Sequence, residues 1–135
     1  MKDPSNEVIK VFFTALNGNT TLPVYTMVPD DVDSFILIGD YSGLEDSAKD
    51  TFIFDSTITI ELVKRYSGQG SKKEVNDDVN TIFGIVRDDF ASGLTMTGFC
   101  MSVVTVGNIV DFVEEDDEYK IYRKIIRFNM IITEV

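Results

Sequence analysis

Apolar residues recur every three or four positions between residues 8 and 16, with polar residues between them. This spacing places the apolar side chains on one face and predicts a short amphipathic helix. Asp3 is a candidate N-cap with Pro4 in the first helical position. Asn17-Gly18 is typical of a helix end, because glycine readily adopts the left-handed conformation found there.

Two short apolar runs follow at residues 23–26 and 35–38. The segment between them contains a proline and two aspartates at residues 28–31, which favour a turn. The pattern therefore predicts strand, turn and strand. Four consecutive apolar residues in the second run indicate burial on both faces, inside a sheet or beneath a helix.

The clearest pattern is the alternation of apolar and polar residues from 51 to 66, which predicts a long strand with one solvent-exposed face. The glycines at residues 67–70 end this strand. Ser71 and Glu74 then have the spacing of a capping box, and apolar residues at helical spacing continue to Val86. A second helix is therefore predicted over residues 71–86.

The last third of the chain predicts two strands, over residues 97–105 and 119–133, which form a hairpin. Gly107-Asn108 and the acidic run 114–118 lie between them. The order of helix, strands, helix and strands indicates one α+β domain over residues 1–135. We expect a mainly antiparallel sheet of four to five strands with two helices packed on one face.

The amino-acid composition excludes several classes of enzyme mechanism. The chain has no histidine and one cysteine, so Ser-His-Asp triads, Cys-His dyads, imidazole zinc ligands and intramolecular disulfides are excluded. Its formal net charge of −11 opposes binding to phosphate backbones or to an anionic membrane. The polar N-terminus leads into an amphipathic stretch, so we expect no signal peptide, no membrane span and a reducing intracellular setting.

Three features could be interpreted as catalytic or metal-binding sites, and each has a simpler explanation. The acidic run 114–118 lacks the ligand spacing and central glycine of a calcium loop, so we expect a solvated loop. Asp30, Asp31 and Asp33 stand beside a proline, where aspartate is ordinary turn chemistry. Cys100 has no histidine to activate it. We therefore expect no enzyme activity and no catalytic, cofactor-binding or metal site.

Several local sequences occur in the order found in one known family. They are the N-terminal helix, Pro23-Val24-Tyr25, Val28-Pro29, Phe35-Ile36-Leu37-Ile38-Gly39-Asp40, the long strand ending near Tyr66, the helix over 71–86 and the closing segment 122–128. In this order, over most of the chain, they resemble the tail-completion proteins of long-tailed bacteriophages and prophages. These proteins are also called tail terminators or head-tail joining proteins.

The resemblance implies a structural virion protein without a cofactor. Such proteins form a ring, commonly a hexamer, that caps the finished tail tube and joins the tail to the head. The implied partners are further copies of the chain, the tail tube protein and the head-neck connector proteins. The implied location is the tail-neck junction of the virion, after assembly in the host cytoplasm. DNA would pass through the ring without binding tightly, because like charge opposes adhesion.

If copies pack side by side, the polar faces of the long strand and the last strand are the candidate contacts. The candidate cross-subunit charges there are Glu61, Arg65, Arg123 and Arg127. Exposed ion pairs are weak, so they would set register more than affinity. The alternative hypothesis is a stand-alone domain that binds a small molecule or a protein. In that case the apolar sheet face and the two helices would enclose a pocket.

Overall fold

Six strands form one sheet in the order β1-β2-β3-β6-β5-β4. The computed structural model describes residues 2–47, 50–67, 72–90, 95–115 and 119–135. The elements in chain order are α1 (Ser5–Leu16), β1 (Val24–Tyr25), β2 (Phe35–Glu45), β3 (Ile53–Ser67), α2 (Lys72–Phe90), β4 (Thr95–Met96), β5 (Phe99–Glu115) and β6 (Tyr119–Glu134). All neighbouring strands are antiparallel except β1 and β2, which are parallel.

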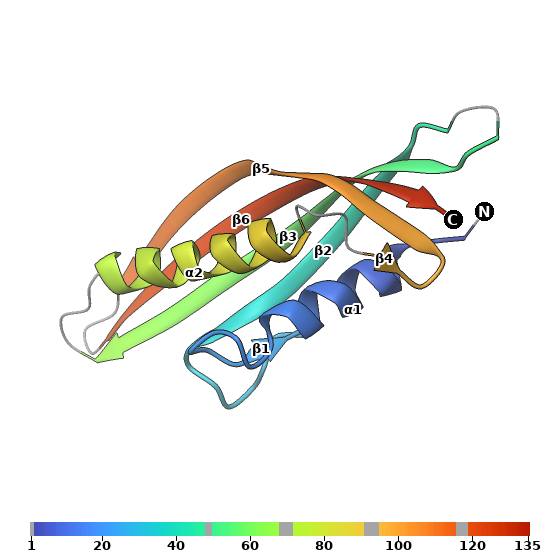
Figure 1. The fold of residues 1–135 in the computed structure, drawn as a ribbon. Helices are drawn as coiled ribbons and strands as arrows, with labels where there is room; N and C mark the ends of the chain where they lie inside the picture. The colour runs from blue at the N-terminus through green and yellow to red at the C-terminus, as the bar shows by residue number, and fades with distance from the viewer. Residues whose placement is uncertain (1, 48–49, 68–71, 91–94, 116–118) are drawn as a thin grey trace.

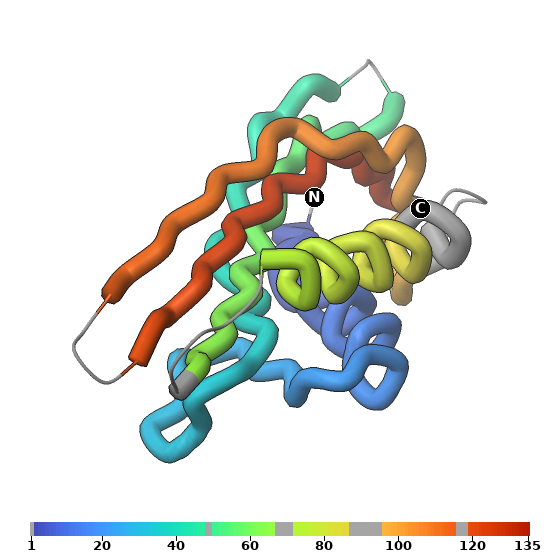
Figure 2. Tube along the Cα trace, turned by 90° about the vertical axis from the view of Figure 1, so that its left-hand side faces the viewer, coloured from blue at the N-terminus to red at the C-terminus, as the bar shows by residue number. Residues whose placement is uncertain are grey.

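Both helices lie against the same face of the sheet (Figures 1 and 2). Helix α1 contacts α2, β1, β2 and β4, and α2 contacts β3, β5 and β6. The predicted α+β class, the mainly antiparallel sheet and the helices on one face are confirmed. Four strands, β2, β3, β5 and β6, are long, whereas β1 and β4 are two-residue strands at the sheet edges.

The core lies between the helices and the sheet. Alternate side chains of β3, among them Ile58, Ile60 and Leu62, are fully buried on the helix side. Phe128 of β6 meets one aromatic ring from each helix, with its centroid 6.0 Å from that of Phe12 and 6.0 Å from that of Phe83. Phe128 therefore ties both helices to the middle of the sheet.

The ends of α1 agree with the sequence except for one position. Pro4 occupies the N-cap, so the helix begins one residue later than the expected Asp3 cap implies. The Asp3 carboxylate still accepts hydrogen bonds from the Ser5 hydroxyl and from the Ser5 backbone N–H, and these bonds lower the pKa of Asp3. Gly18 follows the helix with φ of +81°, as predicted for a glycine at the C-terminal end.

Strand β2 is longer than its apolar run. The sequence predicts a strand over 35–38, but β2 continues to Glu45 through residues with weak strand preference, including Gly39 and Gly43. The added residues pair with β3, from Tyr41 opposite Ile58 to Glu45 opposite Phe54. The extension of β2 therefore comes from its pairing with β3 and is not predicted by the sequence of β2 itself.

The predicted hairpin of the last two strands is confirmed, but β5 is longer than the predicted strand over 97–105. The expected break at Gly107-Asn108 is a bulge within a strand that runs on to Glu115. A Cβ atom on Gly107 would lie 2.7 Å from Nδ2 of Asn129, so the glycine allows close approach of β6 without ending β5. Glu114 and Glu115, expected in a loop, belong to the strand, while 116–118 lie outside the described residues.

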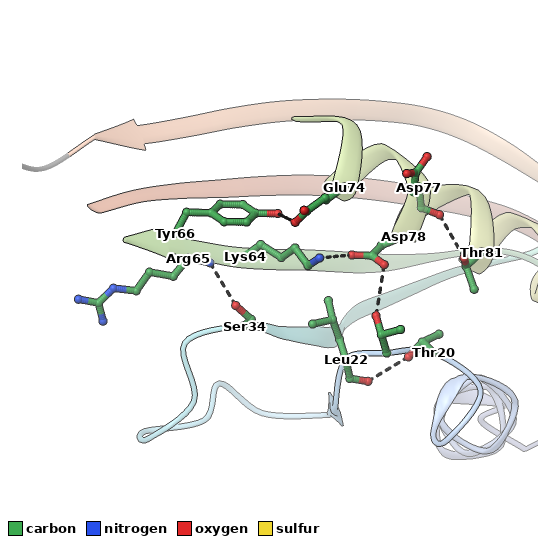
Figure 3. Close-up of polar contacts among 11 residues, drawn as sticks. Thr20, Leu22, Ser34, Lys64, Arg65, Tyr66, Glu74, Asp77, Asp78 and Thr81 are labelled. Carbon is green, nitrogen blue, oxygen red and sulfur yellow. Dashed lines mark hydrogen bonds and ion pairs between the residues drawn. The ribbon is translucent and has the colours of Figure 1, made fainter. Parts of the chain in front are cut away.

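Polar contacts join α2 to β3 (Figure 3). The Tyr66 hydroxyl donates to Glu74 Oε2 over 3.0 Å, and Lys64 Nζ lies 2.6 Å from Asp78 Oδ2. Burial, together with the hydrogen bond to Glu74 and nearby negative charge, raises the pKa of Tyr66 to about 12. The predicted helix over 71–86 is confirmed and extends to Phe90, whereas Ser71 of the capping box lies outside the described residues.

Candidate subunit interface

The four candidate interface residues share one face of the sheet, the face opposite the helices. Side chains alternate along a strand, and the neighbours Ile60, Leu62 and Ile126 are buried on the helix side. Glu61 and Arg65 of β3, with Arg123 and Arg127 of β6, therefore project from the other side, which we call the helix-free face. This common placement follows the parity that the sequence predicts.

Two of the four residues pair with each other inside the chain. Arg123 Nη1 donates to Glu61 Oε1 over 3.1 Å, and Arg123 Nε lies 3.4 Å from Glu114 Oε1. The Glu61 side chain is 22% exposed and the Arg123 side chain 36% exposed. Arg123 thus lies between carboxylates from the two strands that flank β6, and its charge is balanced within one copy.

Arg65 is held by a different partner. Its Nη1 donates to Asp33 Oδ1 over 2.9 Å, and its guanidinium carbon lies 3.8 Å from the ring centroid of Tyr119. The backbone N–H of Arg65 also donates to the Ser34 hydroxyl, which ties the loop before β2 to β3 (Figure 3). Asp33, which the sequence places in an ordinary turn, therefore positions Arg65.

Arg127 stands apart from these pairs. It is exposed on β6 between Thr59 of β3 and Asn108 of β5, and it makes no ion pair with another described residue. Of the four candidates it is the cation whose charge remains available to a partner. It therefore offers the cleanest test of the predicted interface.

A groove of about 210 Å³ lies on the helix-free face, beside the loop before β2. Its floor includes Phe35, Leu37 and Val63, and both Arg65 and Arg123 line it. The alternative hypothesis places a pocket between the sheet and the helices, whereas this groove is on the opposite face. Its volume is below the range of roughly 300–1,000 Å³ typical of small-molecule sites.

Strand β5 carries an apolar free edge that the sequence prediction missed. Strand β4 pairs only with Phe99 and Cys100, so no described strand covers the outer side of β5 beyond them. Four apolar side chains in this part are 37% to 49% exposed: Ile109, Val110, Phe112 and Val113. The signal in the sequence is this cluster of strand-forming residues just after Gly107-Asn108.

The acidic residues of β5 point to basic residues of β6. Asp111 Oδ1 lies 3.1 Å from Lys124 Nζ and Glu115 Oε1 lies 3.6 Å from Lys120 Nζ, in addition to the contact between Glu114 and Arg123. Each of the three acids of the β5 edge therefore lies beside a cation of β6, and Glu114 shares its cation, Arg123, with Glu61. The exposed apolar side chains of this edge are accompanied by ion pairs with β6.

Among the described residues, no group of three or more histidine, cysteine, aspartate or glutamate side chains is placed to hold a metal ion. Over the same part of the chain, no helix is both long and apolar enough to span a membrane. Cys100 is half-buried beside β4.

No family model matches the chain, and no curated protein matches it. Among solved structures, the fold is similar to that of a chain in the "Virion of native gene transfer agent (GTA) particle". The TM-score is 0.64 at 12% sequence identity, and the alignment covers 93% of this chain and 95% of the other. At this identity the likeness establishes a shared fold over nearly the whole of both chains.

Proposed function

We propose that this chain is a structural protein of a tailed-phage virion, which forms a ring that caps the tail tube and joins it to the head. The observation that carries the proposal is the fold shared, over nearly its full length, with a chain of a virion particle. The local sequences that resemble tail-completion proteins support the same function. No reaction is part of this function.

The surface of the molecule suits assembly. Strand β5 has an uncovered edge with exposed apolar side chains, and such an edge is a template for pairing with another chain. On the helix-free face, Arg65 and Arg123 form ion pairs, whereas Arg127 makes none with another described residue. Contacts of this kind, repeated head to tail between identical copies, close into rings when the rotation between copies allows it.

A stand-alone binding domain is the second candidate, and the groove beside Arg65 and Arg123 is the observation in its favour. The groove is small for a cofactor or metabolite. The assembly function accounts for both the helix-free face, on which the groove lies, and the open edge of β5, so we prefer it.

The test combines solution mass with imaging. Light scattering over a wide range of protein concentration, at low and high salt, should reveal a species of roughly six chain masses. Imaging after mixing with tail tubes of the encoding phage should place rings at tube ends. A protein that stays monomeric at every concentration and also leaves tube ends bare would contradict the function. Saturable binding of a small molecule by that monomer would favour the second candidate.

A further inference from the structure

The free edge of β5 has two parts that differ in regularity. Its pairing with β6 shifts between Ser102 and Thr105 and again between Val106 and Asn108, and Val103 has φ of +52°. From Asn108 to Glu115 the register is unbroken. Bulges protect an edge from further pairing, so the regular part is the one open to another strand. Four of the five exposed apolar residues of β5 lie in this regular part, and the fifth, Val103, lies in the bulged part.

The opposite edge of the sheet has a matching open part. Strand β1 covers β2 only at Ile36 and Leu37. After a register shift at Gly39 and Asp40, β2 pairs regularly with β3 from Tyr41 to Glu45, and no described strand covers its outer side. Leu44 in this part is 72% exposed. Each copy therefore presents two different open edges.

Strand directions make these two edges compatible. The strands β2, β3, β6 and β5 alternate in direction across the sheet, so β2 and β5 of one copy run in opposite directions. When two copies stand side by side in the same orientation, β5 of one therefore meets β2 of the next antiparallel. The junction continues the pairing already present within each copy.

The position of the open parts along the strands also fits closure. The open part of β5 lies at the end of the sheet near Tyr119, whereas the open part of β2 lies at the other end, near Ile53. Pairing them displaces each copy along the strand direction relative to the last. Closing a sheet into a barrel requires such a stagger, because its strands must tilt relative to the axis.

The choice of a second copy as the occupant follows from the two edges, because one chain supplies both of them in compatible directions. Two chains of net charge −11 repel each other over most of their surface. On the regular part of β5, Asp111, Glu114 and Glu115 each lie beside a cation of β6. These contacts reduce the repulsion between this edge and a second copy, whose open part of β2 brings one acidic residue, Glu45.

We propose that β5, from Asn108 to Glu115, pairs antiparallel with β2, from Tyr41 to Glu45, of a second copy of this chain. The pairing repeats head to tail, so each copy uses both edges and the sheets join. This inference rests on the proposed ring and names the surfaces that build it. It further assigns the exposed apolar residues of β5 to the junction between copies.

Paired cysteines test the junction. In a Cys100→Ser background, Val110→Cys is combined with Ser42→Cys or with Leu44→Cys, because Val110, Ser42 and Leu44 all lie on the helix-free face. Residues opposite each other in an antiparallel pair lie close enough for a disulfide. Mild oxidation should give a ladder of covalent oligomers on a denaturing gel for one of the two combinations. Val110→Cys with Lys10→Cys, on exposed α1, is the collision control and should remain monomeric.

The outcomes separate this inference from the proposed function. Rings without a ladder in either combination would overturn the β5 to β2 junction and leave the ring standing. A covalent dimer from Val110→Cys alone would indicate symmetric pairing of two β5 edges and would also overturn it. Absence of rings under all conditions, including at tube ends, would remove the proposed function and the junction together.

A second variant tests the junction without cysteines. Lysine on an open edge discourages pairing, so Val110→Lys should abolish rings while the melting temperature of the monomer stays the same. Val103→Lys, at a more exposed position in the bulged part of β5 (69% against 37% for Val110), is the control and should assemble normally. Equal assembly of both variants would overturn the assignment of the regular part.

Discussion

Substitution of Arg127 tests whether the helix-free face takes part in self-association. The residue is exposed and makes no ion pair with a described residue, so its substitution should leave the monomer intact. We predict that Arg127→Glu weakens self-association about three- to tenfold, in keeping with about 1 kcal/mol for an exposed charge contact. Sedimentation or light scattering measures the association, and thermal unfolding checks the fold. Lys10→Glu on α1 is the charge-matched control, and equal behaviour of the two variants would remove Arg127 from the interface.

The pair of Glu61 and Arg123 supports a second residue-scale prediction. Their side chains are partly exposed, so solvent screens the attraction between them. A double-mutant cycle with Glu61→Gln and Arg123→Met should give a coupling free energy of about 0.5–1 kcal/mol in chemical unfolding. A coupling near zero would mean that the contact contributes nothing to the monomer. Both residues would then be available to a neighbouring copy.

At the scale of elements, the packing of both helices on β6 depends on Phe128. Its side chain is fully buried between Phe12 and Phe83. Phe128→Ala should lower the free energy of unfolding by about 3–5 kcal/mol, because the cavity remains next to two helices. Phe112→Ala, at an exposed position of β5, should change it by no more than about 0.5 kcal/mol. Urea unfolding of the two variants under the same conditions measures the contrast, and similar losses would contradict the assigned core.

The hydrogen bond between Tyr66 of β3 and Glu74 of α2 leads to a prediction of how stability depends on pH. The pKa of Tyr66 is raised from 10.0 to about 12, so the folded protein keeps the phenol proton to higher pH than the unfolded chain does. The stability that this proton contributes is fully present below pH 10 and is lost as the pH rises towards 12. Unfolding free energy should therefore fall more steeply over this interval in the native protein than in Tyr66→Phe. Parallel curves of unfolding free energy against pH for the two proteins would show that folding does not raise the pKa of Tyr66.

On the scale of the whole molecule, net charge predicts the response to DNA. A chain of net charge −11, in which 23 acidic residues outnumber 12 basic ones, repels the phosphate backbone of DNA. We expect no retention of duplex DNA in a mobility-shift experiment at about 0.15 M ionic strength and micromolar protein. A ring that DNA traverses needs this property. Tight binding under these conditions would contradict the proposed passage of DNA.

Local sequence determined the long strand β3, the helix α2 and the side of each that is buried. The alternation in β3 and the helical spacing in α2 are periodic over many residues, and each period is imposed by the geometry of the element itself. The same parity placed Glu61, Arg65, Arg123 and Arg127 together on one face. Composition alone excluded histidine-dependent chemistry.

Tertiary structure decided what depends on partners distant in the chain. The extension of β2 to Glu45 and of β5 to Glu115 comes from pairing with strands that supply the backbone hydrogen bonds. Glu61 meets Arg123 across 62 positions of sequence, and β5 is left with an open edge because β4 is short. Such contacts depend on how strands are ordered in the sheet. Periodicity within one segment carries no information about that order.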